Sequence, residues 1–240
     1  MTDAGKAPID VTEAAEGLDA APAIEILRWA SHRVPRLTFA TGFGAEGCVL
    51  IDLIARARLP IDVFSLDTGV LFPETYELWR RLENKYGIEI RAVRPAQTIP
   101  AQALAHGPTL WERDSNRCCD LRKVVPLRHE LSKFDGWITA IRRDQTPQRA
   151  NARVVERDTK FGLVKVNPLV TWTHDAVWAH LYAHDVPYNV LHDRGYPSIG
   201  CEPCTAPVAA GEDPRSGRWK GQTKKECGLH VADEENTNAA

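Results

Sequence analysis

Six cysteines are the residues with the clearest capacity for chemistry in this chain of 240 residues. Four of them form two close pairs far apart in the sequence: Cys118 and Cys119 are adjacent, and Cys201 and Cys204 are separated by two residues. The N-terminus lacks the basic and apolar regions of a secretory signal, so we expect a cytoplasmic protein without a disulfide framework. The two pairs therefore indicate metal or redox chemistry, with enough thiolates for one four-cysteine site.

The spacing of the pairs favours one kind of site over two others. Structural zinc normally uses two Cys-x-x-Cys knuckles around a tetrahedral ion, and the adjacent Cys118 and Cys119 make a poor knuckle. An iron–sulfur cluster is larger and offers separate iron corners to neighbouring thiolates, so a cluster is favoured and zinc stays as an alternative. Cys201 and Cys204 also have the spacing of a thioredoxin-like redox pair, but Pro207 follows too soon for the long helix that such a pair precedes.

The cysteine nearest the C-terminus, Cys227, lies in the segment Lys224-Lys225-Glu226-Cys227-Gly228-Leu229-His230. Neighbouring lysines and a histidine favour the thiolate, and a terminal arm can carry a nucleophile into a pocket and out again. The same segment fits an exposed thiol without a function equally well. Cys48, in contrast, begins an apolar helical stripe and is expected to be an inert core residue.

Several basic residues occur where they could bind an anion, although the formal net charge is only -2. That charge argues against a nucleic-acid binder with a basic surface, and no apolar run is long enough to cross a membrane. Arginines in strand-end loops and glycine-rich segments suit the bidentate binding of phosphate or sulfate. The candidates are Lys123 one helical turn after Cys119, Arg142 and Arg143 after a predicted strand, and Arg215 and Arg218 near the C-terminus.

Alternating helices and strands must position these residues. Hydrophobic periodicity predicts strands around 37–39, 61–66, 88–93 and 137–141. It predicts helices around 24–34, 49–57, 73–86 and 118–131, the last kinked at Pro126, and one more that Thr173 caps. This alternation predicts an α/β fold with a Rossmann-like parallel sheet flanked by helices. We expect a disordered segment 1–20, a nucleotide-binding domain 21–210 and an irregular, mobile C-terminal arm 211–240.

A glycine loop joins the first predicted strand to the next helix, in Thr41-Gly42-Phe43-Gly44-Ala45-Glu46-Gly47. In this context backbone N–H groups and the positive end of the helix attract an anion, usually a phosphate. Gly42, Gly44 and Gly47 also match the dinucleotide-binding spacing, with Asp67 as a ribose ligand, so the loop by itself leaves a dehydrogenase open.

Taken together, these motifs resemble the assimilatory adenylyl-sulfate (APS) reductases of bacteria and plants. The resemblance rests on both cysteine pairs and the tail 226–230, and on Gly44-Ala45-Glu46, Leu66-Asp67-Thr68-Gly69, Arg142-Arg143-Asp144-Gln145 and the Arg-x-x-Arg-Trp segment at 215–219. It implies an adenine nucleotide alpha hydrolase-like fold and removes the dehydrogenase alternative. One departure stands out: the family's loop usually reads Ser-x-Ser-Gly-Ala-Glu-Asp, so segment 41–47 lacks a hydroxyl and a carboxylate.

The resemblance also implies a mechanism. Cys118, Cys119, Cys201 and Cys204 would ligate a [4Fe-4S] cluster that positions Lys123 without passing electrons to the substrate. The Cys227 thiolate would attack the sulfuryl sulfur of APS, releasing AMP, and thioredoxin or a similar dithiol would resolve the resulting S-sulfocysteine and release sulfite. The positions implied to bind substrate are Gly44, Ala45, Glu46, Leu66, Asp67, Thr68, Lys123, Arg142, Arg143, Arg215, Arg218 and His230.

Other functions remain open at this point. The nearest is reduction of 3'-phosphoadenylyl sulfate (PAPS), alone or beside APS, by relatives that typically lack the cluster cysteines. A metal-bound nucleotide sensor without catalysis would not need Cys227, and an iron–sulfur enzyme that modifies nucleic acid conflicts with the charge balance. The family often forms oligomers, and a homo-oligomer is left open for this chain.

Overall fold

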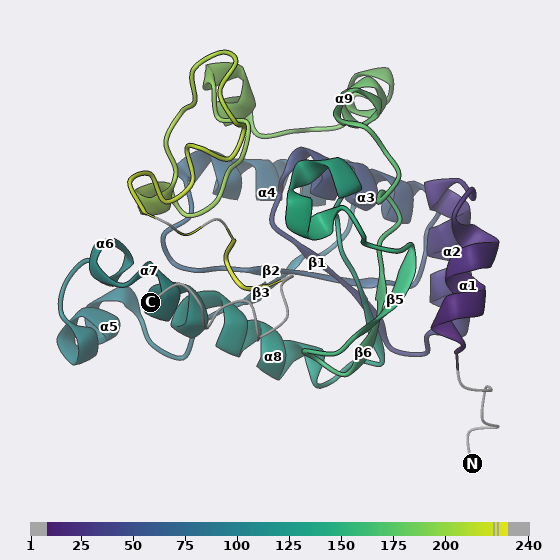
Figure 1. Cartoon of the computed structure of the whole chain (residues 1–240), viewed down its shortest axis with the longest axis horizontal. Coiled ribbons are helices and arrows are strands. Elements are labelled where there is room, and N and C mark those ends of the chain that lie inside the picture. The colour runs from purple at the N-terminus through teal and green to yellow at the C-terminus, as the bar shows by residue number, and fades with distance from the viewer. Residues whose placement is uncertain (1–8, 223, 225, 230–240) are drawn as a thin grey trace.

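The computed structural model describes residues 9–222, 224 and 226–229 (Figure 1). In this part of the chain six strands form one sheet in the order β3-β2-β1-β4-β6-β5. The strands are β1 (Leu37–Thr41), β2 (Asp62–Leu66), β3 (Arg91–Val93), β4 (Gly136–Ile138), β5 (Val155–Asp158) and β6 (Leu163–Val166). Neighbouring strands are parallel except β5 and β6, which are antiparallel. The predicted parallel arrangement is therefore confirmed for the four predicted strands, β1 to β4, and β6 extends it by one strand. β5, β6 and the antiparallel pairing between them were not predicted.

The centre of the sheet explains where a ligand can bind. Phe39 of β1 lies beside Val63 of β2 on one side and Ile138 of β4 on the other. β1 and β2 are joined through a helix, whereas the chain reaches β4 only after the whole of β2 and β3. Connections that diverge from adjacent parallel strands leave a crevice beyond their carboxyl ends. The glycine loop after β1 and the loop after β4 both begin at this crevice.

Helices cover both faces of the sheet, with α3, α4 and α9 over one face and α8 over the other (Figure 1). The larger apolar cluster lies on the first side and includes Leu50, Leu82 and Leu181, all almost fully buried. The smaller cluster gathers Phe64, Leu127, Leu131, Trp137 and Leu163, and Leu229 near the C-terminus packs against it. The α-helices are α1 (Val11–Leu18), α2 (Ala23–Arg33), α3 (Ala45–Arg56), α4 (Pro73–Tyr86), α5 (Ile99–His106), α6 (Leu110–Arg113), α7 (Ser115–Cys119), α8 (Val125–Leu131) and α9 (His174–Ala183).

The N-terminal segment differs from its prediction. Residues 11–18 form α1, although we expected disorder up to residue 20. The Asp10 side chain accepts hydrogen bonds from the N–H groups of Thr12 and Glu13, which are otherwise unpaired at a helix start. Ala15 is buried and α1 contacts β5, so both the cap and packing against an unpredicted strand stabilise this helix.

The predicted helix 118–131 is interrupted by a π-helical turn at Asp120–Val124, between α7 and α8. At its end the Val125 N–H donates to the Asp120 carbonyl, five residues back. Pro126 has no N–H, so the regular α-helical bonding cannot pass through it, and the predicted irregularity lies just before this residue. The turn carries Arg122 and Lys123, and such turns are frequent at functional sites.

Two further expectations concern the second half of the chain. β4 ends at Ile138, three residues before the predicted end of the strand. Beyond residue 187 the described chain forms only short 3-10 turns and isolated bridges, as its proline and glycine content predicts.

In the described residues no helix has both the length and the apolar character required to cross a bilayer.

Candidate active site

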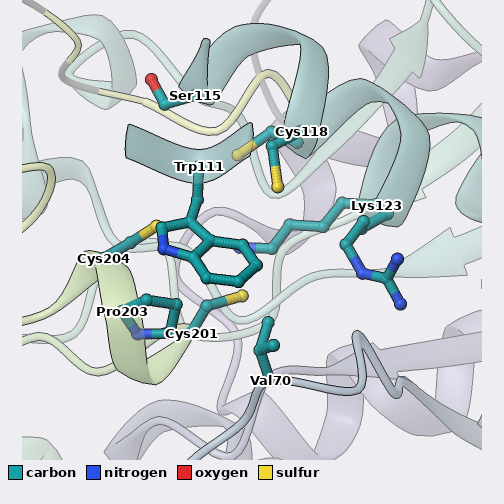
Figure 2. Close-up of a pocket in the computed structure, with 10 residues that line it drawn as sticks. Val70, Trp111, Ser115, Cys118, Lys123, Cys201, Pro203 and Cys204 are labelled. Carbon is teal, nitrogen blue, oxygen red and sulfur yellow. The ribbon is translucent and has the colours of Figure 1, made fainter. Parts of the chain in front are cut away.

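The four paired cysteines line one pocket, although about eighty residues separate the pairs (Figure 2). Cys118 and Cys119 come from α7, and Cys201 and Cys204 flank a 3-10 turn at Glu202–Cys204. Lys123 lines the same pocket. Across the described residues, no three His, Cys, Asp or Glu side chains are arranged to hold a metal ion. The structure therefore shows a cavity shared by four thiols and does not by itself show a metal centre.

Backbone contacts hold the second cysteine pair between two other segments. The Glu202 N–H donates to the Val70 carbonyl at 2.9 Å, and the Trp219 N–H donates to the Cys204 carbonyl at 3.0 Å. Bridges also join Leu71 to Cys201 and Thr205 to Arg218. The loop after β2 and the Arg-x-x-Arg-Trp segment thus fix the position of this pair.

Two glycines lie where the chain packs closely, one against Arg218 and one against Ala206. A Cβ atom on Gly200 would lie 2.2 Å from the Arg218 guanidinium, and one on Gly217 would lie 2.1 Å from the Ala206 carbonyl oxygen. The Arg218 guanidinium also stacks 4.5 Å above the Trp219 ring. Gly200 immediately precedes Cys201, so its lack of a side chain brings a cation next to the second cysteine pair.

Charges in the pocket favour ionisation of one thiol over the others. Burial raises the pKa of Cys201, but Lys123, a contact with the Thr68 hydroxyl and Arg218 outweigh it, and the net pKa is lowered. Burial and the neighbouring thiolates raise the pKa of Cys204 to about 12. Burial lowers the pKa of Lys123, but the thiolates of Cys201, Cys119 and Cys227 raise it more, so Lys123 stays cationic. Four thiolates can share this cavity only if positive charge compensates them.

Arg122 supports the same pocket and was not predicted from the sequence. Its guanidinium is buried and donates to the Thr68 carbonyl at 2.6 Å and to Gln102 at 3.0 Å. The Thr68 hydroxyl lies 3.3 Å from the Cys201 sulfur. The only hint in the sequence was its place beside Lys123. Arg122 and Thr68 therefore join the loop after β2 to the cysteine pocket.

The glycine loop is shaped by a contact that accounts for its departure from the family pattern. The Thr41 hydroxyl accepts a hydrogen bond from the Phe43 N–H at 3.1 Å, and a Cβ on Gly47 would lie only 2.8 Å from that hydroxyl. Phe43 adopts a left-handed conformation and packs 5.0 Å from the Trp79 ring. Gly44 precedes α3, so the loop delivers its backbone to the start of a twelve-residue helix.

Several predicted substrate-binding residues already have protein partners. Arg142 pairs with Glu46 at 2.8 Å, and Arg143 pairs with Asp19, outside the cysteine pocket. Asp67 accepts from the Tyr76 hydroxyl at 2.6 Å and from Arg94 at 3.0 Å.

Two other predicted substrate-binding residues are apolar: Ala45 is buried, and Leu66 packs against the smaller apolar cluster. The contacts of these residues with a substrate stay predictions.

The C-terminal segment is docked so that Cys227 lies near the cysteine pocket. Cys227 lines an open pocket of about 380 Å³ together with Lys160 and Lys224, and it is close enough to Lys123 to raise its pKa. Lys160 donates to the Gly228 carbonyl at 2.8 Å, and Lys224 donates to the Ser115 carbonyl at 3.0 Å. Arg149 and Arg215 both pair with Glu226. His230, predicted to bind substrate, lies outside the described residues.

Comparison with known proteins identifies the family. A model of the phosphoadenosine phosphosulfate reductase domain matches residues 36–207, most of the chain. The chain belongs to this family. The adenosine 5'-phosphosulfate reductase of Bacillus velezensis is 48% identical over 210 residues, which are 87% of this chain and 90% of that protein. Adenosine 5'-phosphosulfate reductase 1 of Bacillus subtilis is 49% identical, again over 87% of this chain and 90% of that protein. The family resemblance found in the sequence is confirmed.

Solved structures confirm the expected fold class. A phosphoadenylyl-sulfate reductase from Candida auris, in a phosphate complex, superposes with a TM-score of 0.76 and 30% identity, covering 84% of this chain and all of that one. An FMN adenylyltransferase from Candida glabrata, in complex with ATP, has a TM-score of 0.56 at 13% identity, covering 97% of this chain and 82% of that one. The second likeness shows the adenine nucleotide alpha hydrolase-like fold alone, because the identity is too low to carry function.

Proposed function

We propose that this protein reduces adenosine 5'-phosphosulfate (APS) to sulfite and AMP in assimilatory sulfate reduction, with Cys227 as the nucleophile. The observation that carries the proposal is that Cys227 lines a pocket together with Arg117 and Val124, which are the chain neighbours of Cys118 and Lys123 in the four-thiol pocket. The relatives named adenosine 5'-phosphosulfate reductase support the choice of substrate. The division into a nucleotide-binding domain 21–210 and an arm 211–240 belongs to this proposal.

Binding would use fixed donors and nearby cations. The N-terminus of α3 offers unpaired N–H groups and positive dipole charge to the 5'-phosphate. Lys123, Arg215 and Arg218 lie around Cys227 and Cys201 and would stabilise charge on the sulfuryl and phosphate oxygens as it develops. Glu46 and Arg142 hold the glycine loop to the loop after β4 and would keep both sides of the site aligned.

The proposed reaction has two balanced stages. The Cys227 thiolate attacks the sulfuryl sulfur, the sulfur–oxygen bond breaks, and AMP leaves with the electron pair. A dithiol such as thioredoxin then attacks the Cys227 sulfur, and sulfite leaves with the electron pair of the bond between the two sulfurs. The second thiol of the dithiol frees Cys227, so the dithiol is oxidised by two electrons and the sulfate sulfur is reduced by two.

The four-thiol pocket fits a [4Fe-4S] cluster better than a single ion. Its donors are all sulfur and two of them are adjacent, which suits the separate iron corners of a cluster. Burial and neighbouring thiolates raise the pKa values of Cys118 and Cys204, so a cation would be needed to keep both ionised. Cys118, Cys119, Cys201 and Cys204 would hold the cluster, which would supply a fixed local charge beside Lys123. Every proton and electron pair in the two stages above moves on Cys227, the substrate and the dithiol.

The partners and place of action follow from this chemistry. A thioredoxin-like dithiol needs access to Cys227, which is half-buried and opens onto a pocket rimmed by Lys160 and Lys224. Reduced dithiols are maintained in the cytoplasm, so we place the reaction there. A homo-oligomer is compatible with the proposal and is not required by it.

The deciding experiment is intact-protein mass spectrometry after anaerobic incubation with APS and no thiol. We expect one sulfonate on Cys227, identified by peptide mapping, with release of AMP; adding thioredoxin should remove it and release sulfite. A folded, iron-loaded protein that forms no adduct with APS or PAPS would refute the reductase function and leave a nucleotide-binding role.

PAPS is the second candidate substrate, since the matched family model and the Candida auris structure carry that name. The same experiment separates the two nucleotides. An adduct with PAPS and none with APS would keep the chemistry and replace the substrate, and comparable adduct rates with both would indicate a dual reductase.

A further inference from the structure

The residue before the nucleophile forms ion pairs with two arginines from different parts of the chain. Arg149 Nη2 lies 3.2 Å from each carboxylate oxygen of Glu226, and Arg215 Nη2 lies 3.1 Å from one of them. The side chains of Glu226, Arg149 and Arg215 are only 10%, 12% and 20% exposed. Buried charges of this kind are tolerated when they are paired, and removing one partner leaves the other uncompensated.

Arg149 is itself tied to the nucleotide loop. It ends a 3-10 turn (Pro147–Arg149), and its Nη1 donates to the Gln145 side-chain oxygen. The Gln145 side-chain nitrogen donates to Glu46 at 3.0 Å, in the first turn of α3. A continuous chain of side-chain contacts therefore runs from the loop after β1, through Gln145 and Arg149, to the residue beside Cys227.

Cys227 is also anchored on its other side. Lys160 donates to the carbonyl oxygen of Gly228 at 2.8 Å, so both neighbours of the nucleophile are bonded to the body of the protein. The thiol itself opens onto the pocket that these contacts border. With one anchor before Cys227 and one after it, the backbone of this residue is fixed, and the positions that its side chain can reach are limited.

We propose that Arg149 and Glu226 are positioning residues, and that their ion pair holds Cys227 in line with a substrate bound at the glycine loop. The proposal rests on the proposed function and adds to it a link between nucleotide loop and nucleophile. Arg149 has no contact with Cys227 and acts through Glu226. The pair forms when the arm docks and must break when the arm swings out toward a dithiol, so it sets the fraction of time that the nucleophile is in place.

The test compares Arg149→Met and Glu226→Gln with the wild-type enzyme, prepared anaerobically. A misplaced reactive atom can cost about 100-fold in rate, so we expect kcat to fall by about 10- to 100-fold in each variant while KM changes little. The double variant should be no slower than Glu226→Gln, because that substitution already breaks the contact with Arg149 along with the one with Arg215. Arg149→Lys, which keeps the charge, should recover part of the rate.

A second measurement needs no substrate. Iodoacetamide labelling of Cys227, followed by peptide mass, should be several-fold faster in both variants because the arm undocks more often. The matched control is the exposed pair Arg28 and Glu25, 2.6 Å apart on α2 and far from the site. Arg28→Met and Glu25→Gln should leave both the kcat and the labelling rate at wild-type values.

The results that overturn the proposal are distinct from failure of the proposed reaction. Unchanged kcat and unchanged labelling in both variants would show that the pair positions nothing. A lower KM with intact kcat in Glu226→Gln would show instead that Glu226 competes with substrate for Arg215. If the wild-type protein forms no sulfonate on Cys227, the proposed function fails, and the labelling experiment still decides whether Arg149 and Glu226 hold the arm.

Discussion

The sheet and the C-terminal arm are stabilised by different kinds of contact. Around the sheet, leucines such as Leu50 and Leu82 are completely buried between helices and strands. In the described arm, residues 211–222, 224 and 226–229, Trp219 is the one large side chain that is fully buried. Leu229 adds a contact with the smaller apolar cluster, and the Trp219 N–H donates to the Cys204 carbonyl. The other contacts of the arm with the body include those of charged side chains, among them Lys160, Lys224 and Glu226.

This difference suits what each region has to do. Apolar burial is lost only when a whole core opens, so it gives the sheet a fixed crevice. A single hydrogen bond contributes little net free energy, because water can replace it, and a buried ion pair gains little beyond the cost of removing its two charges from water. An arm held in this way can dock Cys227 and release it without disturbing the core, as the proposed reaction with a nucleotide and then a dithiol requires.

The sharpest test of the comparison is Cys227→Ser. We expect turnover to fall by at least about 10³-fold, because a serine hydroxyl is a far weaker nucleophile than a thiolate. The urea midpoint of unfolding should match that of the wild-type protein, because the arm contributes little to the core. Sulfite release and a urea titration measure the two quantities. Turnover within a few-fold of wild type would show that another group attacks the substrate.

The opposite pattern is expected for Leu82→Ala in α4. Leu82 is fully buried, and truncating a buried leucine costs about 2–5 kcal/mol of unfolding free energy. At a temperature where the variant is folded, turnover should stay near that of the wild-type enzyme, because the site lies at the edge of the sheet. Urea unfolding checks the first result and sulfite release the second. An unchanged midpoint would contradict the account of the core.

A pH titration tests a polar contact inside the core. Asp52 is buried, which raises its pKa, but hydrogen bonds from His180 and Tyr86 and the charge of Arg56 lower it more. Because the folded-state pKa lies below the unfolded-state value of about 4, stability is complete above that pH and is lost as pH falls toward the folded-state pKa. The unfolding free energy of Asp52→Asn should therefore fall less steeply below pH 4 than that of the wild type. Parallel curves would show that Asp52 has no such role.

The smallest expected effect is that of salt on the arm. Raising NaCl from about 0.05 to 1 M shortens the Debye length from about 14 Å to 3 Å and weakens the pairs at Glu226. Iodoacetamide labelling of Cys227 should speed up by about two- to fivefold, relative to a small free thiol labelled at each salt concentration. The urea midpoint should not fall over the same range. Labelling that is insensitive to salt would show that apolar contacts of Leu229 and Trp219 hold the arm instead.

Much of the fold could be predicted because its elements carry local patterns. Pro73 opens α4 and Thr173 caps α9, as predicted, and the strands near 37–39 and 61–66 lie where their apolar runs indicate. The β5–β6 pair was missed because its strands are short and their antiparallel pairing depends on contacts that a local sequence pattern does not encode. α1 was missed although its Asp10 cap is a local signal. The π-helical turn before Pro126 was predicted only as a kink, because a missing N–H does not say how the preceding turn rearranges.

The candidate site, like the fold, was predicted in part from the sequence. Residue types and spacing singled out the two cysteine pairs, because thiol pairs at such spacing serve few purposes, and the resemblance to a family added Cys227. Only the tertiary structure decided that Gly200 makes room for Arg218, that Thr41 fills the space beside Gly47, and that Arg143 pairs with Asp19. The contact between Arg149 and Glu226 was also visible only in the tertiary structure. These residues are 77 positions apart, so their contact depends on how the chain returns to the sheet, and it leaves no periodic pattern in the sequence.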